Sequence, residues 1–171
     1  SPRPSDSADT MPYSLSDASE NVLTKLNIMD REEIKKFLRH REPMLLVDEM
    51  ELQNDGTECV GKYHVRGDEF FLQGHFPGYP VVPGVILCEI MGQCSSLLIK
   101  DYLVGHTTLF TGIDKTRFKR QVRPGDTVEV HAHITNHRAM LFCIEAKAMV
   151  EGELCVEANL SFAVIPNDKV K

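Results

Sequence analysis

The stretch Gly74–Ile90, "GHFPGYPVVPGVILCEI", decides the fold because it joins a rigid turn to an apolar helix. Three prolines and three glycines fall within residues 74–84, a composition typical of a tight turn. Pro83 suits the first helical position, where its missing N–H is unpaired in any case. The turn contains His75, and Glu89 is an isolated charge in the apolar segment that follows. Both residues call for a chemical explanation.

An apolar helix is predicted from Pro83 to about Tyr102, with strand-like segments on either side. Because the helix is apolar nearly all round, we expect it to be buried. A sheet wrapped around the helix covers it most simply, which predicts an α+β domain with an antiparallel sheet. The predicted strands span residues 44–53, 58–65, 107–122, 126–136, 139–150 and 153–165.

The beginning of the chain differs in composition from the rest. Residues 1–17 are rich in Ser, Pro and Asp and predict a disordered tail, which leaves residues 18–171 as a single domain. Short helices are expected over residues 18–27 and 30–40. In the second helix Asp30 can act as the cap, and its apolar face is expected to be buried. That face is formed by Ile34, Phe37 and Leu38.

Bulk composition excludes several classes of protein. Lys and Arg number 19 against 25 Asp and Glu, a formal net charge of −6 that argues against general nucleic-acid binding. No apolar run is long enough for a membrane span, and no secretory signal pattern is recognised. Five cysteines without a C-x-x-C spacing predict free thiols in a reducing compartment.

The residue types near the helix start suggest acid–base chemistry on a carbonyl compound. Gly84 and Val85 offer unpaired backbone N–H groups at the positive end of the helix, where a developing oxyanion is stabilised. Glu89 in an apolar setting is expected to have a raised pKa, which suits a general acid. Gln93 lies four residues later and can hydrogen-bond Glu89. His75 is the natural general base.

Three stretches in order resemble one family. "GHFPGYPVVPGVILCEIMGQ", "HREPMLLVDEM" (His40–Met50) and "FTGIDKTRFKRQVRPGDTV" (Phe110–Val128) are similar to the 3-hydroxyacyl-[acyl-carrier-protein] dehydratases of type II fatty acid synthesis. The resemblance covers about residues 29–165. It implies a hot-dog fold, in which a curved antiparallel sheet wraps around a long central helix. It also implies an enzyme of the bacterial cytoplasm or a plastid.

The resemblance also implies a site shared between two subunits of a homodimer, with three dimers forming a hexamer. His75 of one subunit removes a proton from C2 of the substrate, and Glu89 of the other helps the C3 hydroxyl to leave as water. The Gly84 amide polarises the thioester carbonyl, the Val81 carbonyl oxygen fixes the His75 tautomer, and Gln93 orients Glu89. No metal or organic cofactor is implied, because the substrate arrives on the phosphopantetheine arm of acyl carrier protein.

Two further features have alternative explanations. Five basic residues in an acidic chain can dock an acidic carrier protein or protect an edge strand from aggregation. His131 and His133 form an H-x-H that most simply belongs to a solvated strand face, with a metal site as the alternative. The five basic residues are Lys115, Arg117, Lys119, Arg120 and Arg123.

Two other functions remain open beside the dehydratase. A hot-dog thioesterase also uses a carboxylate near a helix N-terminus, and it is distinguished by release of a free thiol. A non-catalytic acyl-binding protein retains the fold without the chemistry.

Overall fold

The computed structural model describes residues 27–170. The predicted tail over residues 1–17 and all but the last residue of the helix predicted over 18–27 lie outside this range. Six strands form one antiparallel sheet in the order β1-β2-β4-β5-β6-β3. The strands are β1 (Glu49–Gln53), β2 (Glu58–His64), β3 (His106–Phe118), β4 (Thr127–Arg138), β5 (Leu141–Val150) and β6 (Glu153–Pro166).

All six predicted strands are present, with shifted ends. The first strand was predicted from residue 44 but begins at Glu49. Residues 45–47 are apolar and buried, as a strand would be, but they lie before the strand. The strand predicted over 107–122 ends at Phe118. Alternate residues of β4 and β5 are buried, as expected for strands with one face on the core.

The central helix is shorter than predicted. α3 runs over Gly84–Cys94 and is followed by a 3-10 segment, Ser96–Tyr102. The hydroxyls of Ser95 and Ser96 donate to the carbonyls of Gly92 (2.8 Å) and Gln93 (2.7 Å). Such bonds compete with the helical backbone pattern. Pro83 is the N-cap of α3, with an extended ψ of 140°, so the helix starts one residue later than predicted.

The helix predicted over residues 30–40 is also only partly correct. α2 spans Arg31–Ile34, and the Asp30 side chain accepts from the Glu33 amide at 2.9 Å, as the predicted cap requires. The chain then tightens into turns, where the Arg41 guanidinium donates to the carbonyls of Lys35, Leu38 and His40. The predicted apolar face is nevertheless buried: Ile34, Phe37 and Leu38 are 0%, 6% and 3% exposed.

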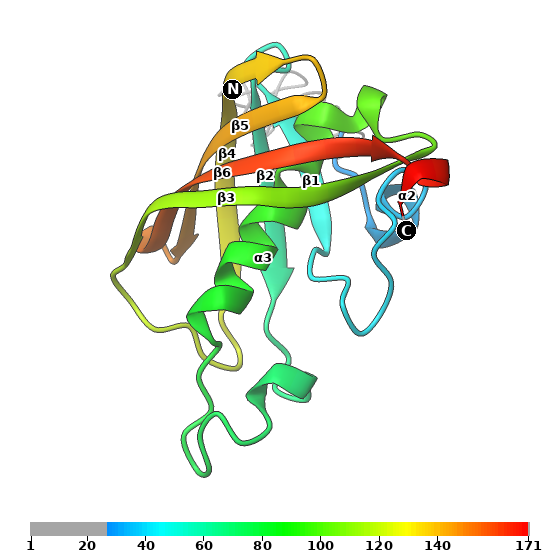
Figure 1. The fold of residues 1–171 in the computed structure, drawn as a ribbon. Helices are drawn as coiled ribbons and strands as arrows, with labels where there is room; N and C mark the ends of the chain where they lie inside the picture. The colour runs from blue at the N-terminus through cyan, green and yellow to red at the C-terminus, as the bar shows by residue number, and fades with distance from the viewer. Residues whose placement is uncertain (1–26, 171) are drawn as a thin grey trace, which may run out of the picture.

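α3 lies within the curve of the sheet, as Figure 1 shows, and contacts β2, β4, β5 and β6. Its apolar side chains form the centre of the core, where Ile90, Met91 and Cys94 are fully buried. This α+β arrangement is the predicted hot-dog fold. No helix within residues 27–170 is long and apolar enough to cross a membrane.

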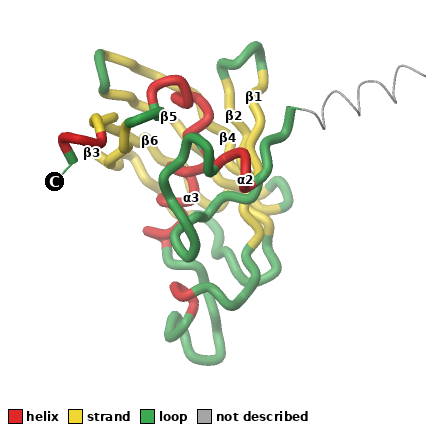
Figure 2. The backbone as a smooth tube through the Cα atoms, turned by 90° about the vertical axis from the view of Figure 1, so that its right-hand side faces the viewer, coloured by secondary structure: helices red, strands yellow, loops and turns green. Residues whose placement is uncertain are grey.

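The chain between β2 and α3 extends away from the sheet. This segment, residues 65–83, includes a short 3-10 helix, Phe70–Leu72, and projects from the body in both views (Figures 1 and 2). It carries His75, whereas Glu89 lies on α3 inside the fold. The two candidate catalytic residues therefore belong to parts of the chain with different surroundings.

Candidate active site

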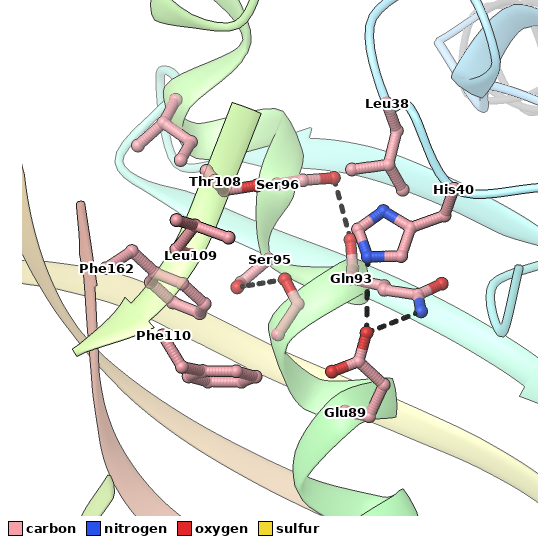
Figure 3. Close-up of a pocket in the computed structure, with 12 residues that line it drawn as sticks. Leu38, His40, Glu89, Gln93, Ser95, Ser96, Thr108, Leu109, Phe110 and Phe162 are labelled. Carbon is pink, nitrogen blue, oxygen red and sulfur yellow. Dashed lines mark hydrogen bonds and ion pairs between the residues drawn. The ribbon is translucent and has the colours of Figure 1, made fainter. Parts of the chain in front are cut away.

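Glu89 lines a cavity of about 230 Å³ between α3, β3 and the loop after α2. Apolar side chains cover most of its wall, and Figure 3 shows the Glu89 carboxyl among the polar groups at one side. Such a cavity suits an apolar chain with one reacting polar group. The apolar lining side chains are Leu38, Ile99, Leu109, Phe110 and Phe162.

Gln93 joins the Glu89 carboxyl to the loop before β1. Its side chain is 2% exposed, and its Oε1 accepts from the Leu46 amide at 2.6 Å. Its Nε2 donates to the Met44 carbonyl (2.8 Å) and to Glu89 Oε1 (2.9 Å). Both amide hydrogens are used, which fixes the orientation of the amide. The expected contact between Gln93 and Glu89 is present.

His40 also lines this cavity, although the sequence pattern predicts for it only a structural role in the loop before the first strand. Its Nε2 lies 3.2 Å from Glu89 Oε1, with the two side chains 29% and 22% exposed. Sequence reasoning missed this pair because 49 positions separate the two residues. The one available signal was the place of His40 at the start of the stretch "HREPMLLVDEM".

The ionisation of Glu89 differs from the prediction. Burial raises the pKa of its carboxyl, but hydrogen bonds from His40 and Gln93 outweigh burial and hold that pKa below its ordinary value. The expected raised pKa is therefore wrong for the single chain. The apolar surroundings and the bond from Gln93 were inferred correctly, and the missing contribution was the second donor, His40.

His75 is held by a compact turn. Its Nδ1 lies 2.8 Å from the Val81 carbonyl oxygen, as expected, and the Val81 amide donates to the His75 carbonyl at 2.9 Å. A carbonyl only accepts, so Nδ1 carries the proton and Nε2 is left with a lone pair. This is the tautomer that a general base needs.

The start of α3 lies beside His75. His75 and Gly84, the first residue of α3, line a second cavity of about 400 Å³ together with Val81, Leu87 and Phe118. Among the hydrogen bonds of residues 27–170, none has the Gly84 or Val85 amide as its donor. Both amides therefore remain unpaired at the positive end of α3, and Val85 is 76% exposed.

Within one chain, the two cavities are separate. Gly84 and Leu87 face the His75 cavity, and Glu89 and Gln93 face the other. Leu87 and Glu89 are two residues apart on α3, or about 200° around the helix axis. His75 and Glu89 are therefore not brought together in one cavity of a single chain.

The five basic residues fall into two groups. Lys119 and Arg120 line the His75 cavity, and Arg123 lines a neighbouring hollow that shares Arg120 with it. The Arg123 guanidinium lies 4.1 Å from the centre of the Tyr79 ring. Arg120 also pairs with Glu153 at 3.2 Å. Lys115 and Arg117 line a different hollow on β3, beside Glu145 and Glu157.

The H-x-H residues each pair with a carboxylate on the exposed sheet face. His131 Nε2 lies 2.8 Å from Glu129, and His133 Nε2 lies 3.9 Å from Glu145. Over the described range, no group of three or more His, Cys, Asp or Glu side chains is arranged to hold a metal ion. These contacts match the interpretation of a solvated strand face.

Known proteins match the chain in sequence and in structure. A model of the FabA-like domain matches residues 38–159. The 3-hydroxyacyl-[acyl-carrier-protein] dehydratases FabZ of Staphylococcus carnosus and Staphylococcus epidermidis are each 42% identical to this chain over 139 residues. The match covers 80% of this chain and 96% of each relative.

Two solved structures show the same fold at low identity. The dehydratase heterocomplex ApeI:P of Xenorhabdus doucetiae has a TM-score of 0.66 at 17% identity, over 78% of this chain and 91% of that one. A mutant of a thioesterase from Pseudomonas aeruginosa has a TM-score of 0.58 at 16% identity, over 81% and 95%. The family model and the relatives, matched over nearly their full length, show that this chain belongs to the FabA-like family, among the FabZ-type 3-hydroxyacyl-[acyl-carrier-protein] dehydratases.

Proposed function

We propose that this enzyme dehydrates (3R)-hydroxyacyl-[acyl-carrier-protein] to the trans-2-enoyl thioester in the fatty acid elongation cycle. The observation that carries the proposal is the Glu89 carboxyl, held by His40 and Gln93 at the side of an apolar cavity. A cavity of this kind accommodates an acyl chain and presents one acid–base group to it.

The proposed reaction is an elimination. Nε2 of His75 takes the proton from C2, and the charge that develops on the thioester oxygen is stabilised by the Gly84 amide and the adjacent Val85 amide. The C3–O bond breaks as the Glu89 carboxyl gives its proton to the leaving hydroxyl, which departs as water. The proton taken by His75 balances the proton given by Glu89. This step needs no metal or organic cofactor.

Glu89 donates a proton only when it is protonated. In the single chain two hydrogen bonds favour its charged form, while burial opposes that form. An acyl chain and a second subunit that cover the cavity remove water from the carboxyl, which strengthens the effect of burial and favours the protonated acid. Substrate binding therefore prepares Glu89 for its role.

The proposed site forms between two copies of the chain. The separation of the two cavities within one chain supports this, as does β3, which pairs with β6 on one side only. An unpaired edge with exposed apolar side chains favours pairing with another strand. Those side chains are Leu109, Phe110, Ile113 and Phe118, which are 38–56% exposed. A hexamer of three such dimers is proposed from the family resemblance alone.

Acyl carrier protein is the proposed partner, in the bacterial cytoplasm or in a plastid. The curated relatives are named for carrier-bound substrates. Lys119 is exposed on the His75 cavity, and Arg123 is exposed on a neighbouring hollow that shares Arg120 and Gln121 with it. Exposed basic side chains close to the His75 cavity favour docking of an acidic carrier protein. Lys115 and Arg117 lie on the unpaired edge strand and fit edge protection as well as docking.

Reversing the charge of the docking residues is expected to weaken carrier binding. The double variant Lys119→Glu, Arg123→Glu should raise KM for the carrier-bound substrate about tenfold, with kcat nearly unchanged, and added salt should reduce the difference. Steady-state kinetics at two salt concentrations measure this. The matched control is Lys62→Glu, Lys147→Glu, which makes the same charge change on β2 and β5, whereas Lys119 and Arg123 lie in the loop between β3 and β4. An equal effect in the control contradicts local docking.

An assay that follows two signals in the same reaction tests the proposed function. The protein is incubated with an enoyl thioester on acyl carrier protein, and loss of enoyl absorbance is followed together with release of thiol. Loss of absorbance without free thiol is the expected result, since elimination runs in reverse as hydration. Free thiol indicates a thioesterase, and absence of both signals indicates an acyl-binding protein.

A further inference from the structure

The Glu89 carboxyl receives both of its hydrogen bonds on one oxygen. Nε2 of Gln93 lies 2.9 Å from Oε1, and Nε2 of His40 lies 3.2 Å from the same atom. Figure 3 shows both donors reaching the carboxyl, from α3 and from the loop after α2. Between residues 27 and 170, no side chain or backbone group donates to Oε2. This leaves Oε2 free to face a substrate.

The hydrogen bonds of His40 assign its proton. Its Nδ1 is buried and has no hydrogen-bond partner in the described part of the chain. A ring protonated on both nitrogens would bury an unpaired N–H of a cation, which costs more than an unpaired lone pair. The proton therefore lies on Nε2, where it points to Glu89. His40 therefore donates to the carboxylate through Nε2.

The backbone around His40 is held in place on both sides. The Arg41 side chain donates to the carbonyls of Leu38 and His40, both at 2.7 Å. After the loop turns back, Gln93 bonds the Met44 carbonyl and the Leu46 amide. Because these bonds tie the loop to itself and to α3, the distance between His40 and Glu89 is set by the fold.

We propose that His40 is a positioning residue, which together with Gln93 fixes Glu89 Oε1 so that Oε2 meets the C3 hydroxyl of the substrate. The inference rests on the proposed function, in which Glu89 reacts. The torsion angle of the terminal carboxyl group of a glutamate has a broad distribution. A carboxyl held by one hydrogen-bond donor can therefore still rotate. Two donors from different segments define its plane. His40 itself makes no bond to the reacting atoms.

Two substitutions separate positioning from packing. His40→Phe keeps a ring but removes the N–H, and His40→Gln restores an N–H at a similar reach. We expect kcat of His40→Phe to fall about ten- to a hundredfold, as for a misplaced catalytic group, with a change in KM below about threefold. His40→Gln should recover most of the loss. The control His131→Phe removes the other close His–Glu pair, on the exposed sheet face, and should be unchanged.

The dependence on Glu89 is tested in a double variant. In the Glu89→Gln background, His40→Phe should lower the residual rate by less than about twofold, because the group that it positions is gone. Equal rates for His40→Gln and His40→Phe, an effect on KM alone, or full additivity with Glu89→Gln would each overturn the inference.

A spectroscopic measurement keeps the test independent of activity. If the unaltered protein hydrates no enoyl thioester, the proposed function fails, but nitrogen NMR of labelled histidines still reports on His40. We expect His40 to be protonated on Nε2 alone and its signal to shift in Glu89→Gln. A proton on Nδ1, or a His40 signal that does not shift in Glu89→Gln, would contradict the contact between His40 and Glu89.

Discussion

Replacing His75 by Ala or Glu89 by Gln is expected to lower kcat about 10²–10⁴-fold, the range of a general acid or base. In His75→Ala no lone pair is available at the position of Nε2, so the C2 proton has no acceptor. In Glu89→Gln the amide has nearly the shape of the carboxyl, but it cannot give a proton to the leaving hydroxyl. Steady-state rates of hydration on a carrier-bound enoyl substrate measure both losses.

Both variants should remain folded, because neither side chain belongs to the apolar core. Unfolding curves and size-exclusion chromatography check this point. His106→Ala is the matched control for His75, since His106 Nδ1 also lies 2.8 Å from a backbone carbonyl oxygen, that of Val104, and His106 lines neither cavity. Retention of more than about a tenth of the rate in a folded His75→Ala or Glu89→Gln would contradict the assigned roles.

The largest effect on stability is expected for Gly61→Ala. Gly61 lies in β2 opposite Val130 of β4, where α3 ends against the sheet. A Cβ at this position would lie 2.4 Å from Cys94 Cβ and 2.9 Å from its Cα and carbonyl oxygen. Backbone atoms cannot move aside as a flexible side chain can. We therefore expect a loss of about 3 kcal/mol or more in the free energy of unfolding, at the upper end of overpacking effects.

Thermal and urea unfolding measure this loss. A loss of about 3 kcal/mol corresponds to a decrease in Tm of roughly 6–12 °C for a domain of this size. Gly112→Ala in β3 is the control, because its Cβ would come no closer than 3.8 Å to Ser161. Similar stability of the two variants would show that helix and sheet separate easily at Gly61.

Local patterns were enough to predict the sheet and the buried helix. Alternation in β4 and the apolar run of α3 each encode burial directly, and the structure agrees with both. The end of α3 was not predicted, because Ser95 and Ser96 tolerate a helix and end it only through their own hydroxyl bonds. The sequence pattern alone does not show whether the two serines continue the helix or end it.

Two local contacts of the candidate site residues were predicted, but the ionisation of Glu89 was not. Glu89 and Gln93 are one helical turn apart, so their contact follows from spacing, and the bond between His75 and Val81 lies within one turn of chain. The lowered pKa of Glu89 depends on His40, which only the folded chain brings near. A contact between distant segments leaves no periodic signal in one sequence. His40 was therefore missed, and the sign of the pKa shift with it.

Subunit mixing tests the shared site most directly. Inactive His75→Ala and inactive Glu89→Gln proteins are combined, exchanged, and assayed, with native mass spectrometry to count mixed dimers. Random exchange makes half of the dimers mixed, and each mixed dimer has one intact site, so about a quarter of the unaltered activity should return. A mixture that stays inactive although mixed dimers are present would show that His75 and Glu89 do not act across the interface.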